Sequence, residues 1–170
     1  MRIAFFTPFL ALALAGCATT VPSQEVATSP APADGEAAPA PAPRHDPTRI
    51  LDPQAAARLL GAHGITLQWI EWDRRGTVFV RKEGGTILLT GTQSEENGPG
   101  RLFMDGAIDE VGTGYFVFRG TIRITDTPDR GRVCEADKTW HFAVTQNRPY
   151  WRLREFEWCD GLTDYVDIYF

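Results

Sequence analysis

The feature that most constrains this fold is the regular recurrence of turn signals after Gly64. Groups rich in Gly, Asp, Asn and Pro return every eight to fourteen residues, and no gap between them is long enough for a crossover helix. These groups are residues 73–76, 84–85, 95–100, 112–114, 126–132, 146–149 and 160–161. Strands joined by such short turns are antiparallel neighbours in sequence order.

Eight β-rich runs lie between these turns, and the clearest of them alternates apolar with polar residues. Phe116, Phe118, Ile122 and Ile124 fall on one face of that run. One apolar face per strand indicates a sheet that is covered on one side. The predicted strands are residues 65–72, 77–83, 86–93, 101–110, 115–125, 133–145, 150–159 and 164–170. We therefore expect an eight-stranded antiparallel up-and-down barrel, which leaves no edge exposed, with a β-sandwich as the alternative.

One short helix is predicted before the strands, over residues 52–61. Asp52 is a suitable N-cap and Pro53 occupies the first helical position. Ala and Leu residues propagate the helix, and Gly61 or Gly64 ends it.

The N-terminal residues have the pattern of an export signal. Met1-Arg2 precedes a short apolar run, which is shorter than the roughly 20 residues needed to span a bilayer. The run closes with Leu14-Ala15-Gly16-Cys17, which resembles the lipobox of bacterial lipoproteins. That resemblance implies a signal peptide over residues 1–16, lipidation of Cys17 with fatty acyl chains such as palmitate, and a membrane partner through this anchor. Ala18 follows in place of Asp, which by the same resemblance implies the periplasmic face of the outer membrane.

A change of composition separates the anchor from the domain. Residues 17–47 are mainly Ala, Pro, Ser and Thr, with too little apolar bulk to offset the entropy of ordering. We predict a disordered linker there and one β-barrel domain over residues 48–170. The net charge of the whole chain is −5 and no basic patch is present, so we expect no nucleic-acid partner.

The domain holds two cysteines, Cys134 and Cys159. The export implied by the lipobox places them in an oxidising compartment, where such a pair usually forms a disulfide. The turn at 146–149 lies midway between them, so we expect cross-strand neighbours at the open end of one hairpin. The apolar phase switches at Arg154-Glu155, which favours a β-bulge in the seventh strand.

The residue types associated with catalysis are sparse. Ser94 lies outside any G-x-S-x-G motif, and the histidines, including His141, do not have the spacing of a metal motif. Glu155 and Glu157 are flanked by arginines, which favours ion-paired surface residues over a catalytic carboxylate pair. We predict no catalytic residue, no metal and no cofactor, and hence a protein that is not an enzyme.

The order of one helix followed by eight strands resembles the calycin or lipocalin plan, although the G-x-W signature of lipocalins is not present. In an eight-stranded barrel the inward side chains either fill the interior or line a cavity for one small ligand. The candidate ligand-binding residues are Leu102, Met104, Phe116, Phe118, Trp140 and Phe142. The first functional hypothesis is therefore non-catalytic binding of an apolar small molecule or lipid.

Two other interpretations stay open. In the first interpretation, the domain is a protein-binding module, either a hydrolase inhibitor or an envelope assembly accessory, that uses the loops 95–100 and 126–132. Alternatively the strands span a membrane, against which the run 77–83 is shorter than the 9–11 residues that a spanning strand needs.

Overall fold

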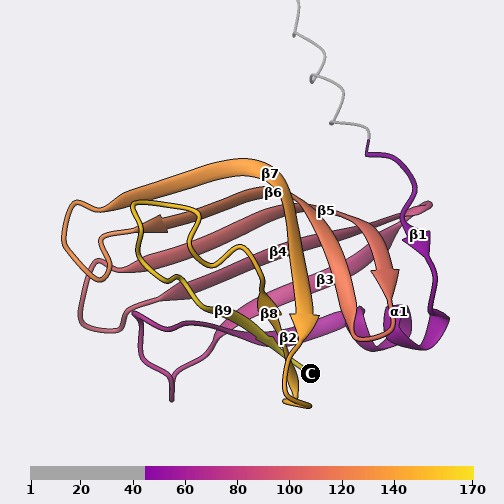
Figure 1. The fold of residues 1–170 in the computed structure, drawn as a ribbon, viewed down its shortest axis with the longest axis horizontal. Coiled ribbons are helices and arrows are strands. Elements are labelled where there is room, and N and C mark those ends of the chain that lie inside the picture. The colour runs from indigo at the N-terminus through magenta and orange to yellow at the C-terminus, as the bar shows by residue number, and fades with distance from the viewer. Residues whose placement is uncertain (1–44) are drawn as a thin grey trace, which may run out of the picture. The chain divides into compact units, whose positions relative to one another are not determined.

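Eight antiparallel strands close into a barrel in the computed structural model, which describes residues 45–170 (Figure 1). The strands pair in sequence order from β2 to β9, and β2 pairs with β9 to complete the ring. The predicted up-and-down barrel is thus confirmed. The predicted signal peptide, Cys17 and the linker up to residue 44 lie outside the described residues.

The elements follow the order β1 (Arg49–Ile50), α1 (Pro53–Leu59), β2 (Gly61–Leu67), β3 (Gly76–Glu83), β4 (Thr86–Ser94), β5 (Arg101–Gly112), β6 (Tyr115–Thr125), β7 (Val133–Val144), β8 (Tyr150–Leu153) and β9 (Val166–Tyr169). In the part of the chain that is described, no helix has the length and apolar character that a membrane crossing requires.

The helix α1 begins where the sequence predicts. The Asp52 carboxylate accepts hydrogen bonds from the backbone N–H groups of Gln54 and Ala55, at 2.9 and 3.0 Å, so it caps the first turn. Ala56 and Leu59 are buried and belong to the barrel core. The helix therefore packs one apolar face against the barrel.

Gly61, not Gly64, marks the change from helix to strand. Gly61 has a φ of +112°, a conformation that L side chains rarely adopt, and β2 begins at this residue. The predicted strand 65–72 is therefore wrong at both ends, because β2 begins earlier, at Gly61, and ends earlier, at Leu67. Ile70 donates its N–H to the carbonyl of Leu67, which turns the chain out of the sheet.

The two-residue strand β1 has no counterpart in the sequence prediction. It pairs in parallel with Glu110 and Val111 of β5, beyond the point where β4 begins. Thr48 fixes this entry, because its hydroxyl donates to the carbonyl of Ile108 at 2.7 Å and accepts from the N–H of Ile87 at 2.8 Å.

The barrel interior is a continuous apolar core. Phe116 and Phe142 stack with ring centroids 4.9 Å apart, and Trp151 meets Phe116 edge to face at 5.7 Å. The aromatic face of β6 and the aromatic face of β7 both point inward, as the alternation predicts. This core holds the ring of strands together.

The strand β8 is shorter than predicted. It ends at Leu153, so the predicted strand 150–159 with a bulge at Arg154-Glu155 is wrong. Arg152 on β8 donates to both carboxylate oxygens of Asp167 on β9, at 2.7 and 2.6 Å, which holds this short strand to its neighbour. The chain then leaves the sheet as a long loop, residues 154–165, before β9 begins.

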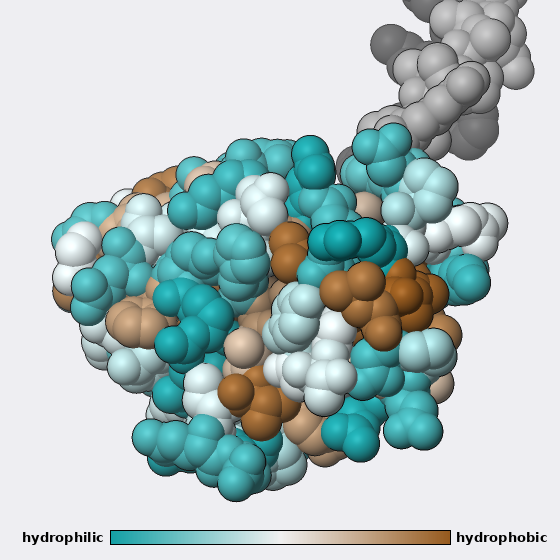
Figure 2. Space-filling model, turned by 45° about the vertical axis from the view of Figure 1, so that its right-hand side comes forward, coloured by the Kyte–Doolittle hydropathy of each residue, from teal (hydrophilic) through white to brown (hydrophobic). Residues whose placement is uncertain are grey.

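The exposed apolar surface near α1 is broken into small areas. Figure 2, which brings the α1 side of the barrel forward, shows hydrophobic patches separated by hydrophilic surface. The large apolar side chains that are exposed are Ile50, Leu51, Leu60, Trp72, Phe79, Val133 and Phe170. Scattered residues of this kind are ordinary on a folded protein.

Candidate functional site

The wall of the barrel is incomplete between β7 and β8. β7 pairs with β6 along its whole length, from Val133 to Ala143, but it pairs with β8 only from Phe142 to Val144. On its β8 side, residues 133–141 of β7 have no strand partner among the described residues. The loop 154–165 runs alongside this part of β7, and we call the space between them the seam.

Two hydrogen-bonded contacts fix the loop at the His141 end of the seam, near the C-terminal end of β7. Arg154 donates its backbone N–H to the carbonyl of His141 at 2.8 Å, which continues the β8 ladder by one residue. The Glu155 carboxylate then accepts the backbone N–H of His141 at 2.9 Å and lies 2.5 Å from its imidazole Nδ1. A side chain thus takes the place of the missing strand. Glu155 is paired at the surface, as predicted, but its partner is His141 and not a neighbouring arginine.

The disulfide Cys134–Cys159 fixes the other end of the seam, at the start of β7. The predicted bond is confirmed, but its predicted place in a hairpin is wrong. Phe142 pairs with Leu153, so the hairpin is centred between Asn147 and Arg148, inside the predicted turn 146–149 but one residue later than the midpoint of the two cysteines. Cys159 lies in the loop and not on a strand, so the bond ties the loop to the first residues of β7.

Arg132 adds an ionic attachment beside the disulfide. Its guanidinium donates to both carboxylate oxygens of Asp160, at 2.8 and 2.9 Å, and to both of Asp164, at 3.0 and 2.9 Å. The indole of Trp69 also donates to Asp164, at 2.9 Å. Arg132 and Asp164 side chains are 6% and 0% exposed. Their hydrogen bonds join three loops at one end of the barrel.

The charges in this group stabilise one another. Hydrogen bonds from Arg132 hold the pKa of the Asp160 carboxyl below its ordinary value. Hydrogen bonds to Asp160 and Asp164 raise the pKa of the Arg132 guanidinium, against the opposing effect of burial. The loop 126–132, which the sequence offered as a binding loop, is thereby fixed to the loop 154–165 and to Trp69, whose carbonyl accepts from the Thr127 hydroxyl at 3.1 Å.

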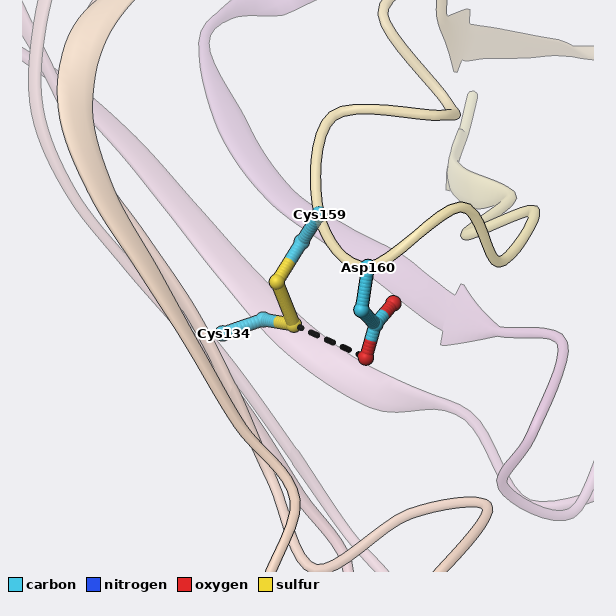
Figure 3. A group of neighbouring side chains, drawn as sticks. All are labelled: Cys134, Cys159 and Asp160. Atoms are coloured by element: carbon cyan, nitrogen blue, oxygen red, sulfur yellow. Dashed lines mark hydrogen bonds between the residues drawn. A yellow bond between two sulfur atoms is a disulfide. The ribbon is translucent and has the colours of Figure 1, made fainter.

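Cys134, Cys159 and Asp160 lie close enough together to resemble a metal-ligand group (Figure 3). The two sulfur atoms are bonded to each other, so neither is available as the thiolate that a metal requires. Asp160 is also occupied by Arg132. The arrangement is therefore a structural fastening.

A cavity of about 380 Å³ opens on the outside of the barrel at the seam. Its lining is Lys138, Arg154, Glu155, Phe156, Glu157 and Trp158. Lys138 falls at the same phase of β7 as the buried residues Cys134 and Trp140, yet its side chain is exposed. Its ammonium lies 4.3 Å from the centre of the Trp140 ring, and Trp140 in turn packs edge to face against Trp158 at 5.1 Å.

The lining combines two cations, two carboxylates and two aromatic rings. The indole N–H of Trp158 is buried and has no hydrogen-bond acceptor among the described residues. Buried donors are ordinarily paired, so this N–H lacks the acceptor that such a group usually has. Such a surface offers polar and stacking contacts together, which suits recognition of a polypeptide.

A second cavity, of about 230 Å³, lies on the outer face of β3, β4 and β5. Its polar groups already pair with each other: Arg81 with Glu83 at 2.7 Å, and Thr90 with Asp105 at 2.8 Å. We therefore take the seam as the candidate site.

The six predicted ligand residues are all buried in the interior. Each is at most 1% exposed, and all belong to the single apolar core; they are Leu102, Met104, Phe116, Phe118, Trp140 and Phe142. Their inward direction matches the prediction, and neither of the two cavities described above is lined by any of them. Binding of a ligand at these residues stays a prediction.

Sequence reasoning missed the residues that line the seam. Two signals pointed to them: the phase switch after Arg154, and a lysine at the apolar phase of β7. Both mark places where the ring of strands is interrupted.

Comparison with known proteins gives one family. The sequence model of the PM1083 family matches residues 47–170, which is nearly the whole described domain. A protein of Pasteurella multocida (strain Pm70), described as "Uncharacterized protein PM1083", is 34% identical over 115 residues. That alignment covers 66% of this chain and 74% of the Pasteurella protein. No solved structure matches.

Proposed function

Because this chain belongs to the PM1083 family, whose matched relative is described as uncharacterized, we propose a function from geometry: a non-catalytic binding module that recognises a protein partner at the seam. The module is held at the cell envelope by a lipid on Cys17. A hydrolase or an envelope assembly protein is the expected class of partner.

The observation that carries this proposal is the fixed loop over an open cavity. The loop 154–165 is attached by a disulfide at Cys159, by Arg132 at Asp160 and Asp164, and by Glu155 at His141. A loop that is already ordered loses little entropy when it binds, so more of its contact energy appears as affinity.

The anchor is supported by the sequence. Leu14-Ala15-Gly16-Cys17 supplies the lipobox, and the Ala and Pro residues that follow supply a spacer. One acyl chain binds a membrane only marginally, whereas several chains on one cysteine hold a protein durably. Ala18 favours the periplasmic face of the outer membrane.

The interior is the less favoured binding place. A ligand there has to displace closely packed rings such as Phe116 and Phe142. Large-to-small changes in such cores cost about 3–5 kcal/mol for Phe, which indicates how much the existing packing contributes.

Site-specific cross-linking in cells tests the proposal. A photo-reactive amino acid replaces Phe156, which lines the seam cavity, or Phe79, which is exposed on the outer face of β3. We expect a defined protein adduct from position 156 and none from position 79. We also expect the adduct to disappear when Lys138 and Arg154 are both replaced by Glu.

Equal labelling from both positions would contradict the seam as the binding site. Mass spectrometry of the purified Cys17→Ser chain gives the complementary result. A stoichiometric lipid that co-purifies with it would favour the interior function instead.

A further inference from the structure

The backbone of β7 presents an unpaired strand edge to the seam. In an antiparallel ladder the N–H and C=O groups of alternate residues point to opposite sides of the strand. Val144 donates its N–H to Gly114 on the β6 side, whereas the C=O of His141 accepts from Arg154 on the β8 side. Counting back from His141, the groups of Thr139, Asp137 and Glu135 also point to the seam.

These three residues are exposed, and no backbone hydrogen bond from the described residues joins them across the seam. Their partner residues on the other side, in β6, are all in place. The contrast with His141 is informative, because there the Glu155 carboxylate occupies the N–H. The backbone of β7 is therefore hydrogen-bonded across the seam at His141 and unpaired there at Glu135, Asp137 and Thr139.

The open edge has defined ends. The Cys134–Cys159 bond closes one end, and the Glu155 contact with His141 closes the other. Six strand residues, 135–140, lie between them, about 20 Å at the usual rise of a strand. The cavity lined by Lys138, Phe156 and Trp158 adjoins this edge, so the loop leaves room beside it.

The chemistry of the edge selects its occupant. It alternates N–H donors with C=O acceptors, a pattern that an extended polypeptide matches and that a phosphate or an acyl chain does not. The nearby charges also disfavour a simple anion, because Glu155 and Glu157 line the same cavity as Lys138 and Arg154. A peptide supplies both the backbone ladder and side chains for the aromatic rings.

We propose that an extended segment of a partner protein adds as a strand to the edge of β7 at Glu135, Asp137 and Thr139, completing the barrel wall at the seam. This deepens the proposed function and rests on it. The fixed loop then acts as the outer wall of a slot that receives the added strand.

The test uses the full chain with Cys17 replaced by Ser and a phage-displayed library of random linear peptides. Selection on this protein is followed by counter-selection on Thr139→Pro, which removes one seam-facing N–H; Thr139→Ala, which keeps it, is the matched control. Enriched peptides are synthesised, and amide hydrogen exchange is followed by NMR with and without peptide. A scan of backbone N-methyl groups along the peptide provides a readout that needs no variant of the protein.

In the free protein we expect fast exchange at the amides of 135, 137 and 139 and slow exchange at 136 and 138. A bound peptide should slow the first three by at least tenfold, and N-methylation should weaken binding at every second peptide position. Thr139→Ala should bind as the parent does.

Three results would overturn the strand addition. The first is slow exchange at 135, 137 and 139 in the free protein, which would mean that the chain's own residues occupy the edge. The second is peptide binding that protects none of these amides or that shows no alternation in the N-methyl scan; such a result leaves the seam as a binding site through side chains. The third is the absence of any enriched peptide, even if the cross-link from position 156 still forms.

Discussion

At the scale of single residues, Arg132 is the side chain that joins the loops 126–132 and 154–165. It satisfies two carboxylates from one loop while it remains almost completely buried itself. A buried charge is tolerated only when its partners remain in place, so each member of the group depends on the others. Asp164 is buried, whereas Asp160 is partly exposed, so the two carboxylates contribute to stability in different ways.

Replacing Arg132 by Met should strongly destabilise the protein. Asp164 would keep only Trp69 as a side-chain donor while remaining buried. Breaking a buried pair of this kind costs about 3–5 kcal/mol. Arg81→Met removes an exposed pair with Glu83 and should cost less than about 1 kcal/mol. Urea unfolding of both variants measures the difference, and equal losses would contradict the structural role of Arg132.

Asp160 should make stability depend on pH in the acid range. Its pKa is lowered in the folded state, so its contribution is fully present above the ordinary value of 3.8 and is lost as pH falls through the lowered pKa. The stability difference between the parent and Asp160→Asn should therefore be largest near neutral pH and shrink in acid. Unfolding curves across this range measure the effect.

Some residue roles were predictable because they depend on neighbours in sequence. Asp52 caps a helix through Gln54 and Ala55, two and three positions away, and the capping preference follows from local chemistry. Arg132 contacts residues 28 and 32 positions later in the chain. No local pattern indicates which of several carboxylates such an arginine will meet.

At the scale of elements, the loop 154–165 takes the place of a longer β8 beside residues 133–141 of β7. Alternation predicts most strands well, because six of the seven connections between them are short and their apolar faces are clear. It fails after Leu153, where Phe156 and Trp158 are also apolar and also spaced by two. Trp158 packs on Trp140 from a loop, and the period of two cannot distinguish that from a strand.

Removing the disulfide should loosen this element more than the barrel. We expect the double change Cys134→Ala and Cys159→Ala to cost about 3 kcal/mol, as the loop-closure model gives for a bond of this separation. Amide exchange should quicken in residues 154–165 and remain slow in β6. Cys17→Ser is the control, because it leaves this bond intact.

Uniform acceleration of exchange across the domain would contradict a local role for the bond. Loss of the cross-link from position 156 in the same double variant would show that binding needs the loop in place.

At the scale of the whole molecule, the barrel is closed by long antiparallel ladders on most sides and by a loop on one. β5, β6 and β7 are the longest strands and form the continuous part of the wall. β8 and β9 have four residues each and form the thin part. The candidate site lies beside the short strand β8, where β7 has backbone N–H and C=O groups without a strand partner.

The anchor belongs to this scale as well. Cys17→Ser should move the protein from the membrane fraction to the soluble fraction without changing its unfolding curve, because Cys17 lies outside the barrel residues. Fractionation of cells and thermal unfolding of the purified chain measure the two effects. Retention in the membrane fraction after this change would refute the lipoprotein interpretation.

The pairing of β2 with β9 has a consequence for the timing of assembly. β9 is the last of the described strands, and it must meet β2, the first strand of the ring. Until residues 166–169 are available, β2 and β8 both keep open edges and the apolar interior stays accessible to water. An emerging chain is therefore exposed to mispairing until its final strand has been made and delivered, and a chain cut short by a few residues would retain that exposure permanently.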